Sequence, residues 1–290
     1  METENMRGRT SPPHRATRHI FDIGRLKGAD RAVNEAEIRA LCSSAYLGDH
    51  WALCRVLGRY KMYVDTRDIG LSSHLMLDGY WEMWLSEELV GCIQPGMTVV
   101  DAGANLGYFT LIMADRVGPK GLVHAFEPNP PIAHRMIKSL EVNGFRSRVT
   151  VHPEPLGDKN DREVILVAPS DEPKNAYVTH EGVGLVLKTR RLDSFPEILD
   201  ADVIKIDAEG AELDIWHGMS GLLERRSRPQ TIFLEYAAAR YADPGDFLRE
   251  IVAAGFSLAE VSFGEGIQPR TEAQILAAPP NIDQMLVLRR

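Results

Sequence analysis

Seven short apolar segments in the last two thirds of the chain constrain the fold more than any other feature. They follow the turn signal "QPGM" and mostly alternate with amphipathic stretches of helical spacing. Strands that alternate with helices are joined by right-handed crossovers, so the alternation predicts an α/β fold with a mostly parallel sheet and helices on both faces. We expect the strands at Thr98–Asp101, Leu122–Glu127, Val149–His152, Val203–Asp207, Thr231–Glu235, Ser257–Val261 and Gln284–Arg289.

Two connections depart from this alternation. A long polar loop, Gly264 to Ile282, joins the last two strands in place of a helix, which allows an antiparallel edge pair. The segment 159–196 is longer than a crossover needs and holds strand-like "REVILVAP" and "VGLVLKTRRL". We therefore expect a seven-stranded sheet with an insert that projects from it.

The chain before residue 95 divides into two parts. Residues 1–18 are polar, basic and proline-containing, and are predicted to form a disordered tail. Residues 19–94 contain apolar residues at helical spacing over 34–59 and again in "SSHLMLDGYWEMWLSEELVGCI", so we expect an N-terminal helical cap. Residues 95–290 are expected to form the main domain.

The composition favours a small-molecule partner. The chain has 33 basic and 41 acidic residues and a net charge of -8, which opposes binding to a nucleic-acid backbone. It has no secretory signal pattern and no apolar run long enough to span a membrane. Its three cysteines lack CxxC spacing, as is typical of free thiols in a reducing compartment, so we expect a cytoplasmic protein.

The first strand ends in a glycine-rich turn. Ligands of open parallel sheets bind beyond the carboxyl ends of the strands, and Asp101 stands at this end. Gly103 can adopt dihedral angles closed to other residues, and Gly107 lets the next helix pack closely. The spacing is G-x-N-x-G, with Asn105 and Tyr108 where the dinucleotide fingerprint has glycines. Pyrophosphate binding is thus disfavoured.

The second strand ends at Glu127, where a carboxylate can accept hydrogen bonds from both hydroxyls of a ribose. In the "PNPP" that follows, Asn129 can cap a helix whose first residue is Pro130. The two strand ends together indicate a nucleoside, not a dinucleotide.

The fourth and fifth strands bring charged residues to the same edge. Lys205 and Asp207 lie on one face of a strand that should be covered by helices, so they must be paired or functional. Glu209 is a functional candidate, whereas Glu212 has a structural explanation at the start of a helix. With Glu235, the carboxylates of Asp207 and Glu209 could bind a divalent cation, or one could be a general base; Lys205 could instead neutralise them.

Three histidines fall in or near this region. His152, His180 and His217 have no metal-ligand spacing with one another, and such histidines are more often surface or core residues. His180 and His217 remain secondary candidates for a base.

Assembled in order, the motifs resemble those of class I S-adenosylmethionine-dependent methyltransferases, and more narrowly the FkbM family. The resemblance covers about residues 95–290 and rests on "VVDAGANLGYFT", "VHAFEPNP", "PLGD", "RLDSF" and "VIKIDAEGAELDIWHGM". Before that range, only "DGYWE" at 78–82 is similar. In "PLGD", Pro155 stands where alanine is common, so that strand end matches less well.

The resemblance implies a Rossmann-like fold and a bed for S-adenosyl-L-methionine. The cofactor-binding residues would be Asp101, Gly103, Ala104, Asn105 and Gly107 around the methionine, Glu127 with Pro128 and Asn129 at the ribose, and Leu156, Gly157 and Asp158 at the adenine. The catalytic candidates are Asp207, Glu209, Glu235 and Lys205, with Asp207, Glu209 and Glu235 also the candidates for a metal.

The reaction implied is O-methylation of a hydroxyl on a small metabolite, sugar or natural product. An alcohol is a poor nucleophile, so a base or a metal must ease the loss of its proton, and Asp207 or Glu209 is expected in that role with support from Glu235. Two alternatives stay open: an NAD-dependent or nucleotide-sugar oxidoreductase, and a non-catalytic nucleoside-binding module. Metal dependence and the choice between monomer and homodimer also stay open.

Overall fold

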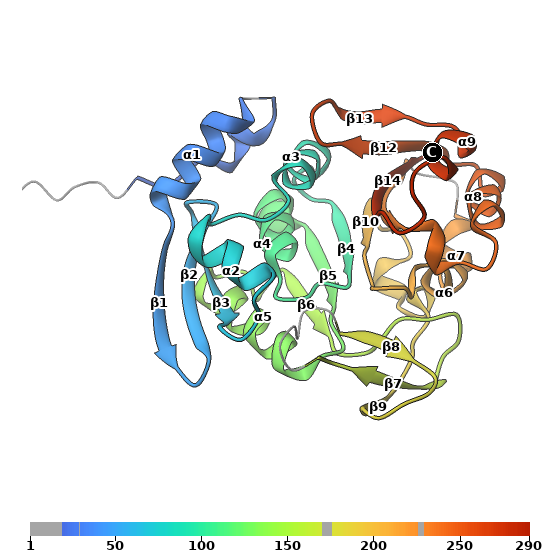
Figure 1. The fold of residues 1–290 in the computed structure, drawn as a ribbon, viewed down its shortest axis with the longest axis horizontal. Coiled ribbons are helices and arrows are strands. Elements are labelled where there is room, and N and C mark those ends of the chain that lie inside the picture. The colour runs from blue at the N-terminus through green and yellow to red at the C-terminus, as the bar shows by residue number, and fades with distance from the viewer. Residues whose placement is uncertain (1–18, 29, 170–175, 226–228) are drawn as a thin grey trace, which may run out of the picture.

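An eight-stranded sheet lies at the centre of the computed structural model, which describes residues 19–28, 30–169, 176–225 and 229–290. Its strand order is β13-β12-β14-β11-β10-β4-β5-β6 (Figure 1). The five strands from β11 to β6 are parallel, and β14 runs antiparallel to both of its neighbours. These strands are β4 (Thr98–Ala102), β5 (Leu122–Phe126), β6 (Val149–His152), β10 (Val203–Ile206), β11 (Thr231–Tyr236), β12 (Ser257–Ser262), β13 (Gly266–Pro269) and β14 (Gln284–Arg289).

All seven predicted segments are strands of this sheet, and β12 and β14 form the expected antiparallel pair. The strand count was one too low. The predicted loop 264–282 contains β13, which pairs with β12, and a short helix, α9 (Glu272–Leu276). The residues of β13 are only partly buried or exposed, so they lack the apolar pattern from which a strand is recognised.

Helices cover both faces of the sheet, as predicted. Val99 of β4 belongs to a core shared with α3 (Met83–Cys92), α4 (Tyr108–Val117) and α5 (Pro130–Val142). Val100 belongs to a second core shared with α6 (Glu212–His217), α7 (Ser220–Leu223) and α8 (Pro244–Ala253). Successive strand residues point to opposite faces, and both faces are apolar here. Short 3-10 turns η1 (Ile23–Leu26), η2 (Gly118–Lys120), η4 (Leu192–Ser194), η5 (Pro196–Ile198) and η6 (Ala238–Arg240) complete the connections.

The N-terminal region contains the expected helices but also a sheet that was not predicted. After α1 (Arg31–Leu41), residues 43–65 form the antiparallel strands β1 (Ser43–Gly48), β2 (Trp51–Val56) and β3 (Tyr60–Asp65), followed by α2 (Leu71–Leu77). The prediction of helices over 34–59 is therefore wrong beyond Leu41. In β2, buried residues alternate with partly exposed ones, a strand period that the helical spacing of leucines and valines obscured. The predicted tail, residues 1–18, lies outside the described residues.

The insert forms a small sheet of its own. Its strands β7 (Glu163–Val167), β8 (Tyr177–Thr179) and β9 (Leu185–Lys188) are antiparallel, in the order β8-β7-β9, and the two strand-like segments predicted there are β7 and β9. Figure 1 shows this sheet beside the main sheet, near α6. No helix among the described residues is long and apolar enough to cross a membrane.

Candidate functional site

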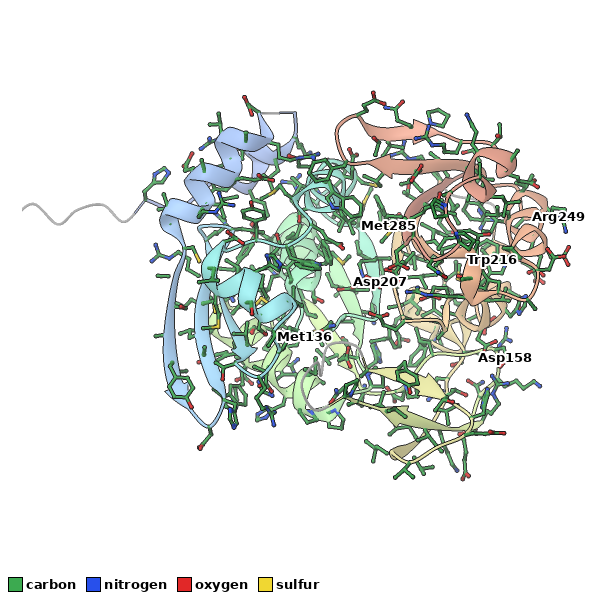
Figure 2. All side chains as sticks on the ribbon, in the orientation of Figure 1. Met136, Asp158, Asp207, Trp216, Arg249 and Met285 are labelled. Carbon is green, nitrogen blue, oxygen red and sulfur yellow. The ribbon has the colours of Figure 1, made fainter. Side chains whose placement is uncertain are left out.

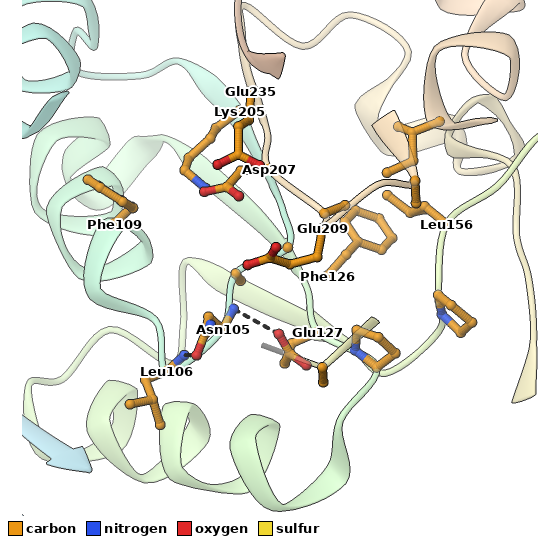
Figure 3. A pocket seen from close by; sticks show the side chains of 18 of the residues that line it. Asn105, Leu106, Phe109, Phe126, Glu127, Leu156, Lys205, Asp207, Glu209 and Glu235 are labelled. Carbon is orange, nitrogen blue, oxygen red and sulfur yellow. Dashed lines mark hydrogen bonds and ion pairs between the residues drawn. The ribbon is translucent and has the colours of Figure 1, made fainter. Parts of the chain in front are cut away.

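A cavity of about 440 Å³ opens where β4, β5, β10 and β11 end. Its wall includes ten of the predicted site residues, namely Gly103, Ala104, Asn105, Glu127, Pro128, Leu156, Lys205, Asp207, Glu209 and Glu235. The N-terminal region adds Leu71, Trp81 and Glu82, and the insert adds Leu166, Ala176 and Val178. Three regions far apart in the sequence therefore enclose one cavity, and Figure 3 shows its charged residues around a common space.

The turn after β4 is shaped by contacts within the chain. Gly103 has a φ of +78°, and a Cβ there would lie 1.8 Å from the carbonyl oxygen of Asp207. Gly107 has a φ of +88°, and a Cβ there would lie 2.6 Å from Cγ of Met136 in α5. Gly103 is thus required by the close approach of the β10 end, and Gly107 by the packing of α5, whereas the sequence predicted a role for Gly107 in the packing of the next helix, α4.

Asn105 takes the left-handed conformation between these glycines, with a φ of +51°. Its side-chain oxygen accepts a hydrogen bond from the backbone N–H of Leu106 at 2.8 Å. Asparagine tolerates this conformation because its short polar side chain can bond locally. The residue that stands in place of a fingerprint glycine is therefore part of the turn itself.

Glu127 sits at one end of the cavity, buried apart from 7% of its surface. Its two carboxylate oxygens accept hydrogen bonds from the backbone N–H groups of Asn105 and Asn129, each at 2.8 Å (Figure 3). Burial raises the pKa of Glu127 to about 7, although the two amides favour the ionised form. Asn129 occupies the N-cap position of α5 and Pro130 is the first residue, as predicted, but the Asn129 side chain makes no capping hydrogen bond, and its backbone N–H donates to Glu127.

Lys205 lies at the opposite end of the cavity. It is buried and faces two carboxylates. Its ammonium donates to Oδ2 of Asp207 at 2.9 Å and lies 3.9 Å from Oδ1 of Asp101. Burial by itself would lower the pKa of Lys205. The nearby carboxylates of Asp207 and Asp101 together have the larger effect and raise the pKa of Lys205 above its ordinary value. Asp101 is fully buried and accepts from the hydroxyl of Thr110 at 2.6 Å; burial raises its pKa. The charges predicted on this strand are therefore paired. Asp101 lies behind the cavity wall and forms an ion pair with Lys205 from there.

Arg240, in η6, is one of the residues at this site that sequence reasoning missed. It pairs with Glu235 at 2.5 Å, with Asp283 at 3.0 Å, and lies 3.7 Å from Glu209. Burial and the Asp207 carboxylate raise the pKa of Glu235 to about 8, against the pull of Arg240. The only signal in the sequence was an arginine five residues after a glutamate at a strand end. That spacing does not show that the two side chains pair.

The three candidate metal ligands do not converge in this structure. Asp207 is paired with Lys205, and Glu209 and Glu235 both face Arg240. Among the residues that the structure describes, the grouping whose metal-ligating atoms come together lies elsewhere. These three carboxylates instead face side-chain cations.

Several predicted residues lie outside the cavity wall. The N–H of Gly157 donates to the carbonyl of Arg190 at 3.0 Å, and Asp158 pairs with Arg162 at 2.7 Å. Figure 2 shows Asp158 near the insert sheet and Asp207 near the middle of the molecule. His180 is exposed, and His217 pairs with Glu250 at 2.9 Å. Neither histidine lines the cavity.

Glu212 has the structural role predicted for it. It is fully buried, and one oxygen accepts from the backbone N–H groups of Ala208 and Gly210, each at 3.0 Å. The carboxylate thereby fixes the turn between β10 and α6, and with it the position of Glu209.

Glu82 enters the cavity from the N-terminal region with an unusual backbone. Its φ is +37°, a left-handed value at the start of α3. The conformation is held because its carbonyl accepts from the N–H groups of Leu85 and Ser86 and from the Ser86 hydroxyl, which also contacts Tyr108 of α4. Non-glycine residues held in this region cluster at functional sites.

Comparison with known proteins gives one family. A family model described as "Methyltransferase FkbM domain" matches residues 101–258. The chain is 28% identical to Methyltransferase 1 of Beauveria bassiana over 145 residues, which are 42% of this chain and 57% of that protein. It is 31% identical to hexuronic acid methyltransferase AglP of Haloferax volcanii over 129 residues, 43% of this chain and 50% of AglP. The chain thus spans about half the length of these curated relatives.

Among solved structures, Methyltransferase FkbM from Methylobacillus flagellatus is similar at a TM-score of 0.42 and 16% identity, covering 75% of this chain and 52% of that one.

Proposed function

The chain belongs to the FkbM methyltransferase domain family, and from that premise we propose that it transfers a methyl group from S-adenosyl-L-methionine to a hydroxyl oxygen of a small molecule. One observation carries the proposal: a single cavity has Glu127 at one end and the Lys205–Asp207 pair, with Glu235, at the other. The first end is suited to binding a ribose, and the second to accepting a proton from the acceptor hydroxyl.

The residues present fit the cofactor. A cavity of about 440 Å³ is within the range that small-molecule ligands occupy. The Glu127 carboxylate is fixed by two amides and retains lone pairs that can accept from the two ribose hydroxyls. Phe126 and Leu156 line the cavity beside it and would contact the adenine. When bound, the cofactor supplies a methyl group activated by the positive sulfur.

Asp207 is our candidate for the base. It lines the cavity, and its Oδ2 is occupied by Lys205, which leaves Oδ1 to accept the proton of the acceptor hydroxyl. Asp207 would take that proton as the acceptor oxygen accepts the methyl group, which the bound cofactor would supply with its sulfide product as the leaving group. Glu209 is a weaker candidate because 42% of its side chain is exposed and it faces Arg240.

Glu235 plays a different part from Asp207. It is paired with Arg240, which fixes its carboxyl group in the cavity wall, so it can orient the acceptor while Asp207 accepts the proton. Two carboxyl groups with separated roles would orient the hydroxyl between them. Holding the reacting atoms in line is the main requirement of methyl transfer.

The charge of the cavity wall favours an uncharged acceptor. Even with Arg240, which pairs with Glu235 and Asp283, cations are fewer than the carboxylates that line the cavity with Lys205, namely Glu82, Glu127, Glu154, Asp207, Glu209, Glu235 and Asp283. AglP is a hexuronic acid methyltransferase, which supports a sugar as the acceptor class. A neutral sugar or polyol avoids the repulsion that a carboxylate would meet in this cavity.

Calorimetric titration of the full chain with S-adenosylhomocysteine and with NAD tests the proposal first. We expect S-adenosylhomocysteine to bind and Glu127→Gln to weaken it. Binding of NAD alone would favour the oxidoreductase and end the methyltransferase proposal. Incubation with methyl-labelled cofactor and a panel of neutral and carboxylated sugars then tests transfer. Cofactor binding without transfer to any hydroxyl compound would favour a non-catalytic binding module.

A further inference from the structure

Two histidines lie together on the sheet, apart from the carboxylates of the cavity. His124 is in β5 and His152 in the neighbouring β6, and both point to the face covered by the second core. Nδ1 of His124 is 3.1 Å from Nε2 of His152. The exposed fractions are 4% for His124 and 8% for His152. The pair is therefore part of the interior of the protein.

This histidine pair leaves one polar atom unsatisfied. Nε2 of His124 is buried and has no hydrogen-bond partner among the described residues. If Nδ1 of His124 carries the shared proton, Nε2 is a buried acceptor without a donor; if His152 carries it, Nε2 is a buried donor without an acceptor. Either tautomer carries the cost of an unmade hydrogen bond at Nε2 of His124, a cost that the contact between the two rings does not remove.

Glu197, in η5, completes a set of three ligands. One nitrogen of each histidine and a carboxylate oxygen of Glu197 lie within 4.8 Å of one another. Glu197 is exposed, which gives an ion a path from solvent to the two buried rings. Two imidazole nitrogens on one tetrahedral zinc ion are about 3.3 Å apart. This is close to the 3.1 Å between Nδ1 of His124 and Nε2 of His152.

The chemistry of the two rings suits a metal. Burial lowers the pKa of His124 to about 4 and lowers the pKa of His152. Both imidazoles are then neutral near pH 7, which is the form that binds metals. The Arg190 guanidinium lies near His152 and works against a cation there, whereas Glu154 and Glu197 work in its favour.

We propose that His124, His152 and Glu197 bind a divalent transition-metal ion, zinc by the nature of the ligands. Two nitrogens and one carboxylate oxygen, with water in the fourth position, are a ligand set that zinc accepts. The ion would tie η5 to β5 and β6. It would also fix the ring of His152, which stacks on Phe126 at a centroid distance of 4.4 Å. Phe126 lines the cavity, so the metal would stabilise the cavity floor without taking part in its chemistry.

Zinc titration of the full chain tests this site. After dialysis against a chelator, we expect calorimetry with Zn²⁺ to give one site per chain and the melting temperature to rise with Zn²⁺ concentration. Cobalt(II) in place of zinc should give the visible absorption of a tetrahedral site. Glu197→Gln, at an exposed position, should weaken zinc binding at least about tenfold without unfolding the protein, and His152→Gln should abolish it.

His217→Gln is the matched control, because His217 and Glu250 form a histidine–carboxylate pair at 2.9 Å on the surface. That variant should bind zinc like the unaltered chain. The proposal is overturned if the unaltered chain binds no zinc, or if Glu197→Gln binds it as tightly. Since neither readout uses S-adenosylmethionine or an acceptor, the result does not depend on the proposed function.

Discussion

At one end of the cavity, Glu127 is held by two backbone amides, whereas at the other end Asp207 and Glu235 are held by the side chains of Lys205 and Arg240. The amides belong to the turns after β4 and β5, so the strands that build the sheet also position them. The two cations pair with carboxylates close to them in the sequence, but packing also brings Asp101 to Lys205 and Asp283 to Arg240. The first end is thus fixed by backbone donors of two turns, and the second by side-chain cations that each face more than one carboxylate.

The largest effect is expected from a substitution in the turn that joins the two ends of the cavity. Gly103→Ala would place a Cβ 1.8 Å from the Asp207 carbonyl, so β4 and β10 could not keep their separation. We expect a loss of more than about 4 kcal/mol in the free energy of unfolding, measured by denaturant titration.

Gly144→Ala is its control, since Gly144 has a similar φ of +73° but nothing within 4 Å of the added Cβ. It should cost only about 1 to 2 kcal/mol, the strain of the left-handed conformation. Equal losses in the two variants would show that backbone strain alone, and not the approach to Asp207, requires Gly103.

The second test removes a cation from the side-chain end. Lys205→Met leaves the fully buried Asp101 without its compensating charge, so we expect about 3 to 5 kcal/mol of destabilisation. Adding Asp101→Asn should restore part of it, because the uncompensated charge is then gone. If the double variant is as unstable as the single one, charge pairing is not what Lys205 contributes.

The third test separates the two ends by function. Asp207→Asn should lower turnover about 10²-fold to 10⁴-fold, as expected for loss of a general base, while the affinity for S-adenosylhomocysteine stays unchanged. Asp246→Asn, at an exposed position of α8, should alter neither quantity. Full activity of Asp207→Asn would remove Asp207 as the base.

The smallest expected effect is a pH dependence of stability. The pKa of Glu127 is about 7 in the folded protein against an ordinary 4.5, so its proton stabilises the folded state at low pH. That contribution is fully present below about pH 4.5 and is lost as the pH rises to 7. Melting temperatures of the unaltered chain should therefore fall more steeply over this window than those of Glu127→Gln. Parallel curves would contradict the raised pKa.

Strand ends were predictable because they depend on patterns within a few residues. The apolar segments located seven of the eight strands, and the residues just after them included Glu127, Asp207 and Glu235, all in the cavity wall. The same reasoning failed for residues 43–65, where apolar spacing fits a helix and a strand alike and only packing against α5 selects the sheet.

The sequence by itself determined the parallel sheet, the glycine turn and the glutamate at the next strand end, because apolar patterns and dihedral limits act over short distances along the chain. Only the tertiary structure decided that Arg240 joins Glu235, that Glu82 enters the cavity, and that His124 meets His152 and Glu197. Those contacts join separate elements of the chain, and their geometry exists only after the two cores have packed on the sheet.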